Sequence, residues 1–468
     1  MALASSSSSA IVFLVSIAVA LSLSSFAASS STTTVRAGYY LAADARLRPL
    51  AALDASLYTH LYYAALPVDP TTRASPVVPA DPDQARLLAA FSSELKSRNP
   101  ALRTLLSVGA ADLASPQQQT TDPAFAAMAA DPSSRASFAA AAVSLAEAHG
   151  FDGLDLAWRY PSSAAEMASL GLLVADLRAA APRGFLLTAA VYFSDHVFAS
   201  PRPGVDYPAE AMALCLDWAN VVAFGLRPGP PPPNATTAFD APLYDRASHF
   251  SASYGVVSWA DAGLPAAKLL MGLPLYGRSW VLRNKAHDGV GAPVVAAGPK
   301  QRRGTNATGV MSYAEVQRLA AAGKGSVVTT TNYDNASVAS YLSVGGVWVA
   351  FDGAAVVDEK LAFAARRGML GYFLWPVNYD DANFTVSRRA SEAWMKNIQQ
   401  ISSNSRNNGT GSRQTQKPVR VPPALQSPVR TPVPMPAPTS GSKHWWLPWR
   451  KLDLFLHLGL LIIILLWS

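Results

Sequence analysis

Cysteine is nearly absent from this chain: Cys215 is the only one among 468 residues. A single cysteine excludes an intramolecular disulfide, and with it the small folds that several such bonds hold together. The chain must therefore be stabilised by an apolar core, for which its 50% of hydrophobic residues provides ample material. Cys215 lies in an apolar stretch, where we expect a buried, inert thiol.

Charged residues are also scarce, at 15% of the chain, although the net charge is +7. The basic residues are spread out, and no basic run is interleaved with aromatic residues, which argues against nucleic-acid binding. His60 has no second histidine or carboxylate at metal-ligand spacing. We therefore expect neither a metal nor another cofactor.

Hydrophobic runs long enough to span a membrane are missing, although an apolar run lies near each end. Ile11–Leu23 is too short for a spanning helix and is followed by small residues that end at Ala28. This pattern predicts a secretory signal peptide over residues 1–28. Export agrees with five Asn-x-Ser/Thr glycosylation sequences, at Asn234, Asn306, Asn335, Asn383 and Asn408.

The C-terminal part has a different composition. Residues 399–443 are rich in Pro, Ser, Asn and Gly and predict a disordered linker. Residues 444–468 end in the apolar run Leu454–Trp467, shorter than the roughly 20 residues of a spanning helix. With the small residues at 440–442 upstream, this segment predicts a hydrophobic membrane anchor, either a glycosylphosphatidylinositol signal or a short transmembrane tail.

Eight short apolar runs predict strands, and helix-like segments separate most of them. The runs cover residues 35–40, 60–66, 103–109, 150–158, 185–192, 218–224, 268–277 and 368–377. Segments 83–98, 134–150 and 163–181 carry apolar residues at helical spacing. This alternation predicts an α/β fold, a closed (β/α)8 TIM barrel within residues 29–398. Surplus chain at about 278–346 predicts an α+β subdomain inserted between strand 7 and strand 8.

The fourth run, "GFDGLDLAWRYPSS", carries the most informative pattern. Asp152, Asp155, Ala157 and Arg159 follow one another at spacings of three, two and two. Residues two apart on a strand share a face, so Asp155, Ala157 and Arg159 are expected to point into the barrel. Function in such barrels lies at the carboxyl ends of the strands, which places residues 157 and 159 nearest the functional rim.

This run resembles the fourth-strand signature of glycoside hydrolase family 18, D-x-x-D-x-D-x-E. The resemblance covers nearly all of residues 35–398 and is nearest to plant class V chitinases. It extends to "VRAGYY", "LYTHLYYA", "RNPALRTLLSVG", "GLPAAKLLMGLPLYGRSW", "WVAFDG" and "GMLGYFLWPVNYDD". In this family the substrate's own N-acetyl group acts as nucleophile, and the final Glu is the general acid.

The resemblance implies that the catalytic motif of this chain is degenerate. Arg159 stands at the general-acid position, where its permanent charge prevents it from donating a proton. Ala157 stands at the position of the assisting Asp. The family's Met-x-Tyr-Asp is "VAFG" here, with Phe224 and Gly225 in place of Tyr and Asp, and Ala65 replaces an aromatic residue. No catalytic residue set is intact.

Much of the family's binding frame remains. The resemblance implies substrate contacts by aromatic residues, with Trp375 as the floor on which a sugar ring stacks. Asp152 and Asp155 match the first two motif aspartates, but a structural role is at least as well supported for them. A buried ion pair between Asp155 and Arg159 would fill the former catalytic space. The six aromatic positions assigned to substrate are Tyr39, Tyr160, Tyr192, Phe224, Tyr276 and Trp375.

Three functions remain open. The first is an inactive chitinase-like protein that binds chitin or other N-acetylglucosamine oligosaccharides at the extracellular face of the plasma membrane or in the cell wall. It resembles the outer domain of chitinase-related receptor-like kinases, so signalling would need a receptor partner. The second is a proteinaceous glycanase inhibitor. The third is a glycosidase with a non-standard acid, for which Asp195 and Asp352 are candidates.

Overall fold

The computed structural model describes residues 34–113, 122–198, 204–226, 235–299, 308–322 and 329–408. The chain divides into two units, Met1–Leu425 and Gln426–Ser468, and the second lies outside the described residues. The predicted signal peptide and C-terminal anchor also lie outside the described residues. Of the predicted linker, only residues 399–408 are described. Among the helices that the structure describes, none is long and apolar enough to cross a membrane.

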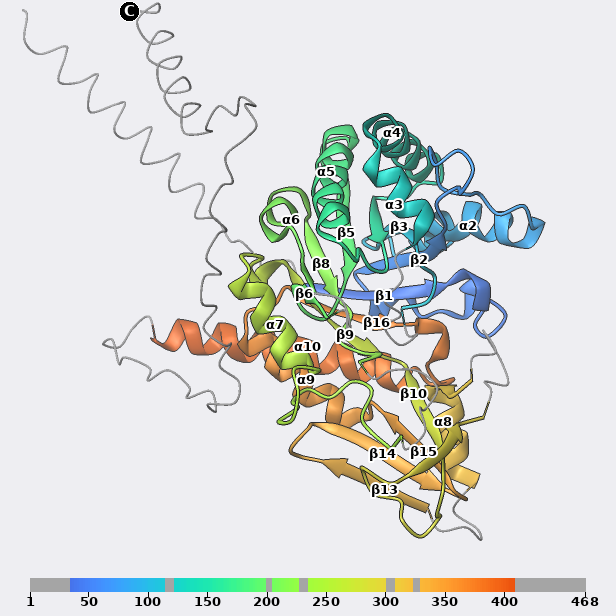
Figure 1. Cartoon of the computed structure of the whole chain (residues 1–468), viewed down its shortest axis with the longest axis vertical. Coiled ribbons are helices and arrows are strands. Elements are labelled where there is room, and N and C mark those ends of the chain that lie inside the picture. The colour runs from blue at the N-terminus through green and yellow to red at the C-terminus, as the bar shows by residue number, and fades with distance from the viewer. Residues whose placement is uncertain are drawn as a thin grey trace, which may run out of the picture. The chain divides into compact units, whose positions relative to one another are not determined.

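Eight parallel strands close into the predicted barrel (Figure 1). Around the barrel their order is β1-β16-β9-β8-β5-β4-β3-β2. Most positions of these strands are buried, which agrees with the continuous apolar runs by which the sequence marks them. The strands are β1 (Val35–Leu41), β2 (His60–Leu66), β3 (Arg103–Gly109), β4 (Gly153–Ala157), β5 (Leu186–Val191), β8 (Trp218–Val221), β9 (Leu269–Pro274) and β16 (Gly371–Trp375).

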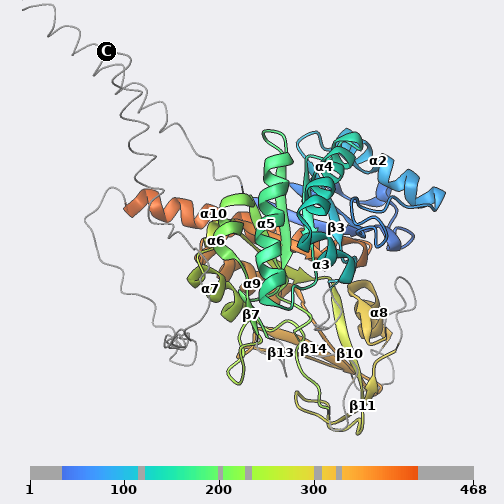
Figure 2. The same cartoon turned by 45° about the horizontal axis from the view of Figure 1, so that its top comes forward.

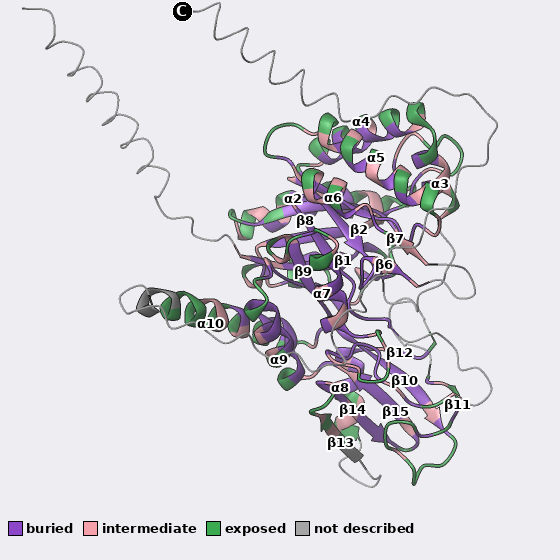
Figure 3. Ribbon diagram, turned by 60° about the vertical axis from the view of Figure 1, so that its left-hand side comes forward, coloured by how far each residue is buried: buried purple, intermediate pink, exposed green. Residues whose placement is uncertain are grey.

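Helices cover the outside of the barrel, with buried inner faces and exposed outer faces (Figures 2 and 3). Local sequence sets where they begin: Asp81 accepts hydrogen bonds from the backbone of residues 83 and 84 before α2, and Ser163 caps α5. The helices are α2 (Pro82–Arg98), α3 (Pro123–Ala130), α4 (Pro132–Ala148), α5 (Ala164–Ala180), α6 (Ala209–Cys215), α7 (Ala252–Asp261), α9 (Ala354–Arg366) and α10 (Thr385–Asn408).

The chain between β9 and β16 forms the expected inserted subdomain. Its sheet has the strand order β11-β10-β15-β14-β13, and β12 pairs with β10. Figure 1 shows this sheet and α8 together at one side of the barrel. The elements are β10 (Tyr276–Leu282), β11 (Val294–Ala297), β12 (Val310–Ser312), α8 (Tyr313–Ala322), β13 (Thr329–Asp334), β14 (Ala339–Val344) and β15 (Val347–Phe351).

The remaining short elements lie in loops. A two-stranded ribbon, β6 (His196–Val197) and β7 (Val205–Asp206), follows β5. The described residues also form the 3-10 turns η1 (Ala42–Asp44), η2 (Leu50–Ala52), η3 (Ala55–Leu57), η4 (Ala266–Lys268) and η5 (Val377–Tyr379). Of the glycosylation sequences, Asn335 and Asn383 are exposed; Asn234, Asn306 and the side chain of Asn408 lie outside the described residues.

Candidate functional site

Asp155 lies in the middle of β4, inside the barrel, and is 0% exposed. Its carboxylate accepts four hydrogen bonds: from the hydroxyls of Tyr39 at 2.9 Å, Ser107 at 2.8 Å and Thr188 at 2.7 Å, and from the Asn220 amide at 3.1 Å. These donors come from β1, β3, β5 and β8. The carboxylate therefore joins five of the eight barrel strands, as expected for a structural role.

The environment of Asp155 also affects its protonation. Burial raises the pKa of this carboxyl above its ordinary value, and the hydrogen bonds from Thr188, Ser107, Tyr39 and Asn220 oppose the increase only in part. Its accepting positions are occupied by protein donors, and water does not reach it. This residue has neither the exposure nor the free geometry of a general acid.

Asp152, the other retained motif aspartate, lies at the opposite end of β4 from the rim. It pairs with Lys96 at 2.7 Å and Arg103 at 2.9 Å, and accepts from the backbone N–H of Thr104 at 2.8 Å. Burial opposes ionisation, but these partners outweigh it, so that the pKa of Asp152 lies below its ordinary value. Asp152 joins β4 to β3 and α2 and does not face the rim.

The two altered motif positions lie just above Asp155. Ala157 is buried and ends β4, whereas Arg159 is half-buried beyond the end of the strand. Arg159 Nη1 donates to the backbone carbonyl of Asp112, in the loop after β3, and the guanidinium carbon lies 5.6 Å from the centre of the Tyr160 ring. The expected ion pair between Asp155 and Arg159 is wrong. Because β4 ends at Ala157, the alternation that would turn Arg159 towards Asp155 does not continue.

The aromatic residues assigned to substrate come together in the structure, but they are buried there. Each is at most 6% exposed and Trp375 is 1% exposed. Tyr39 meets Trp375 with ring centres 5.3 Å apart, and Tyr160 meets Tyr192 at 5.2 Å. Phe224 contacts Tyr276 edge-on at 6.1 Å. A sugar ring could stack on Trp375 only after the groups that cover it had moved.

The loop after β8 brings a carboxylate to the site that sequence reasoning missed. Asp240 accepts a hydrogen bond from the backbone N–H of Gly225 at 3.1 Å and from the hydroxyl of Tyr276 at 2.7 Å. Arg278 donates to it through Nε at 3.2 Å. The only signal in the sequence is an acid within the apolar stretch "TAFDAP", which does not indicate a partner.

The two candidates for a replacement acid are both buried. Asp352 forms an ion pair with Lys360 at 2.5 Å, and Lys360 also donates to the carbonyl of Ala241 at 2.6 Å. Burial raises the pKa of Asp352, and Lys360 opposes this increase. Asp195 is buried as well, on the chain leading to β6. Within the described part of the chain, no group of three or more His, Cys, Asp or Glu side chains could hold a metal ion.

Comparison with known proteins gives a consistent result. The model of the glycosyl hydrolases family 18 matches residues 35–380. A class V chitinase from Arabidopsis thaliana is 34% identical over 372 residues, which cover 77% of this chain and 90% of that protein.

Solved structures agree with the sequence match. A class V chitinase mutant from Nicotiana tobaccum in complex with NAG4 superposes with a TM-score of 0.67 at 31% identity, covering 77% of this chain and 99% of that one. A chitinase-like agglutinin from Robinia pseudoacacia gives a TM-score of 0.64 at 30% identity, over 76% of this chain and 99% of that one.

Proposed function

The chain belongs to glycosyl hydrolase family 18, and we propose that it binds chitin or another N-acetylglucosamine-containing glycan without hydrolysing it. The observation that carries this proposal is the guanidinium of Arg159 at the general-acid position. A guanidinium keeps its proton at any accessible pH, so it cannot protonate a leaving oxygen. The Arg159 guanidinium donates to the Asp112 carbonyl and lies over the Tyr160 ring, contacts that suit a structural cation.

Asp155, Asp352 and Asp240 do not offer a replacement for this acid. A general acid must come within hydrogen-bond reach of the scissile oxygen. Asp155 is enclosed by four donors, and Asp352 is paired with Lys360 in the interior. Asp240 is occupied by three donors of its own. Because these hydrogen bonds and this ion pair already occupy the carboxylates, they favour glycan binding over catalysis.

Two observations support glycan binding. By the family resemblance, part of the aromatic frame that binds sugars remains in this chain, with Trp375 at the end of β16. The similar chain from Robinia pseudoacacia is a chitinase-like agglutinin, and the class V chitinase mutant from Nicotiana tobaccum is in complex with NAG4, which supports glycan binding on this fold. Because the rings are buried, binding requires an opening movement at the rim.

We also propose that the protein acts outside the cell, at the plasma membrane or cell wall, with a receptor partner for signalling. The apolar N-terminal run and the glycosylation sequences support this location. Asn335 and Asn383 are both exposed, as a glycan acceptor must be. The partner would be recognised by its association with the glycan-loaded protein.

The test is calorimetric titration of chitin hexamer into the purified chain, followed by mass spectrometry of the solution left in the calorimeter. Saturable heat with intact hexamer would support the proposal. Shorter oligomers would refute the absence of hydrolysis. No heat and no cleavage would refute glycan binding and favour the alternative function, a glycanase inhibitor.

A further inference from the structure

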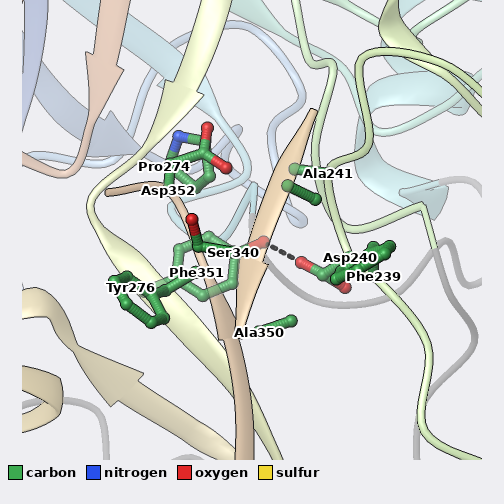
Figure 4. Close-up of a pocket in the computed structure, with 10 residues that line it drawn as sticks. Phe239, Asp240, Ala241, Pro274, Tyr276, Ser340, Ala350, Phe351 and Asp352 are labelled. Carbon is green, nitrogen blue, oxygen red and sulfur yellow. Dashed lines mark hydrogen bonds between the residues drawn. The ribbon is translucent and has the colours of Figure 1, made fainter. Parts of the chain in front are cut away.

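Asp240 is a buried carboxylate surrounded by three hydrogen-bond donors. Its carboxylate is almost fully buried, between the loop after β8 and the first residues of β10. It accepts from the Gly225 backbone at 3.1 Å, the Tyr276 hydroxyl at 2.7 Å and Arg278 Nε at 3.2 Å. Figure 4 shows the hydrogen bond between Tyr276 and Asp240. One carboxylate therefore holds a backbone, a phenol and a guanidinium together.

The buried positive charge of Arg278 is balanced by this carboxylate. Burial lowers the pKa of Arg278, but Asp240 and other neighbours outweigh the effect and raise it above the ordinary value. The side chains of Arg278 and Asp240 are each 6% exposed, so solvent does little to screen either charge. An ion pair broken from one side in such a place leaves a costly buried charge.

Gly225, the backbone partner of Asp240, is one of the altered positions: the family resemblance places an aspartate there. The Gly225 N–H donates to Asp240 Oδ2 at 3.1 Å, so the Asp240 carboxylate lies beside the backbone of position 225. Gly225 has a φ of 66°, a left-handed conformation that Asp adopts more readily than most residues. The carboxylate missing at position 225 thus has a counterpart supplied from position 240.

We infer that Asp240 replaces the missing carboxylate of position 225 and is the positioning residue that holds Tyr276 and Arg278 in place at the glycan site. This inference rests on the proposed function. Asp240 does not contact the glycan, because protein donors occupy it. A cavity of about 10 Å³ beside it, lined by Tyr276, Pro274 and Asp352, has room for roughly one water molecule and not for a sugar.

The first test is Asp240→Asn, with chitin hexamer affinity measured by calorimetry on the full chain. We expect at least a tenfold loss of affinity. The neutral amide no longer balances the charge of Arg278, and its NH2 group would face the donors that bind the carboxylate in the wild type. The matched control is Asp352→Asn, which changes another buried carboxylate of the same cavity. It should lower the thermal unfolding temperature and leave the affinity within about twofold.

The second test separates positioning from mere stability. Gly225→Asp combined with Asp240→Asn returns the carboxylate to position 225 and should recover most of the lost affinity. Recovery would support the inference, whereas a double variant as weak as Asp240→Asn would overturn it. If Asp240→Asn does not fold, the same double variant decides: folding with wild-type affinity supports the inference, and failure to fold overturns it.

A glycan-independent measurement distinguishes failure of this inference from failure of the proposed function. In a double-mutant cycle of Asp240→Asn and Tyr276→Phe, the shifts in unfolding temperature should be strongly non-additive. Additive shifts would overturn the inference even if the wild type binds hexamer. Non-additive shifts in a protein that binds no hexamer would refute the proposed glycan binding and leave the Asp240 contacts supported.

Discussion

The hydroxyl of Tyr39 donates to Asp155 across the interior of the barrel at 2.9 Å. The same hydroxyl accepts from the Asn220 amide at 2.7 Å, and the Tyr39 ring stacks on Tyr62 with ring centres 4.2 Å apart. Two residues with sequence signs of a catalytic site thus form part of one buried network. Asp155 joins the barrel strands through this network, which gives it a structural role independent of catalysis.

The first prediction concerns that network. Asp155→Ala should lower the free energy of unfolding by about 3–5 kcal/mol, because several buried donors lose their acceptor at once. Chemical unfolding measures the loss. Asp152→Ala is the matched control on the same strand; because Asp152 is partly solvated, we expect a smaller loss. Equal losses would contradict the central role of Asp155.

A second prediction concerns catalysis. Restoring the motif with Ala157→Asp and Arg159→Glu should not produce an ordinary chitinase, because Phe224 and Gly225 remain altered. We expect cleavage of chitin hexamer at least about 100-fold slower than a chitinase of the family, since proximity and orientation carry much of the rate. Product analysis by mass spectrometry measures it. Cleavage at a normal chitinase rate would show that the two motif positions alone decide activity.

Trp375→Ala tests the proposed sugar floor. The change should abolish hexamer binding and, because the ring is buried, also cost about 3–5 kcal/mol of stability. Trp394→Ala is the control: Trp394 is equally buried, against Tyr372 on β16 with ring centres 6.1 Å apart, and belongs to α10. It should cost similar stability with binding retained. Loss of binding in both variants would assign the effect to folding.

Buried His60 is expected to contribute to the loss of stability at acid pH. Burial, and secondarily Arg103, lower the pKa of His60 to about 4, and Asp152 opposes this. The unfolded chain has an ordinary histidine pKa near ~6.5, so it binds the proton first as pH falls. Stability from neutral His60 is therefore complete above ~6.5 and is lost towards pH 4, by about 3 kcal/mol.

The measurement is the difference in unfolding free energy between about pH 7.5 and 4.5, for the wild type and for His60→Asn. The variant should lose less stability over this interval, since it has no proton to gain there. His287→Asn, an exposed histidine, is the control and should behave like the wild type. An unchanged difference in His60→Asn would show that other groups cause the acid loss.

Much of the barrel could be predicted because its strands are buried and appear as apolar runs. The predicted runs 60–66 and 103–109 coincide with β2 and β3. The insertion, expected at about 278–346, has elements from Tyr276 to Phe351. Its boundaries are less sharp in the sequence because half-exposed strands alternate polar and apolar residues and resemble loops.

The site was harder to predict. Strand alternation suggested that Arg159 faces Asp155, but β4 ends two residues earlier and the chain turns away. The role of Asp240 depends on a loop that returns to Gly225 from beyond residues 227–234, and no spacing rule links the two. The burial of Trp375 likewise depends on tertiary packing, which cannot be predicted from the residues next to it in the sequence.

The hydrogen-bond network around Asp155 has a consequence for the evolution of inactive enzymes. The general-acid position can change without disturbing this network, because residue 159 lies beyond the end of β4 and is not among the four donors that hold Asp155. Asp155 cannot follow without loosening β1, β3, β5 and β8 together. The number of motif residues that survive is therefore a poor measure of remaining catalysis, because mechanical necessity alone preserves part of the motif.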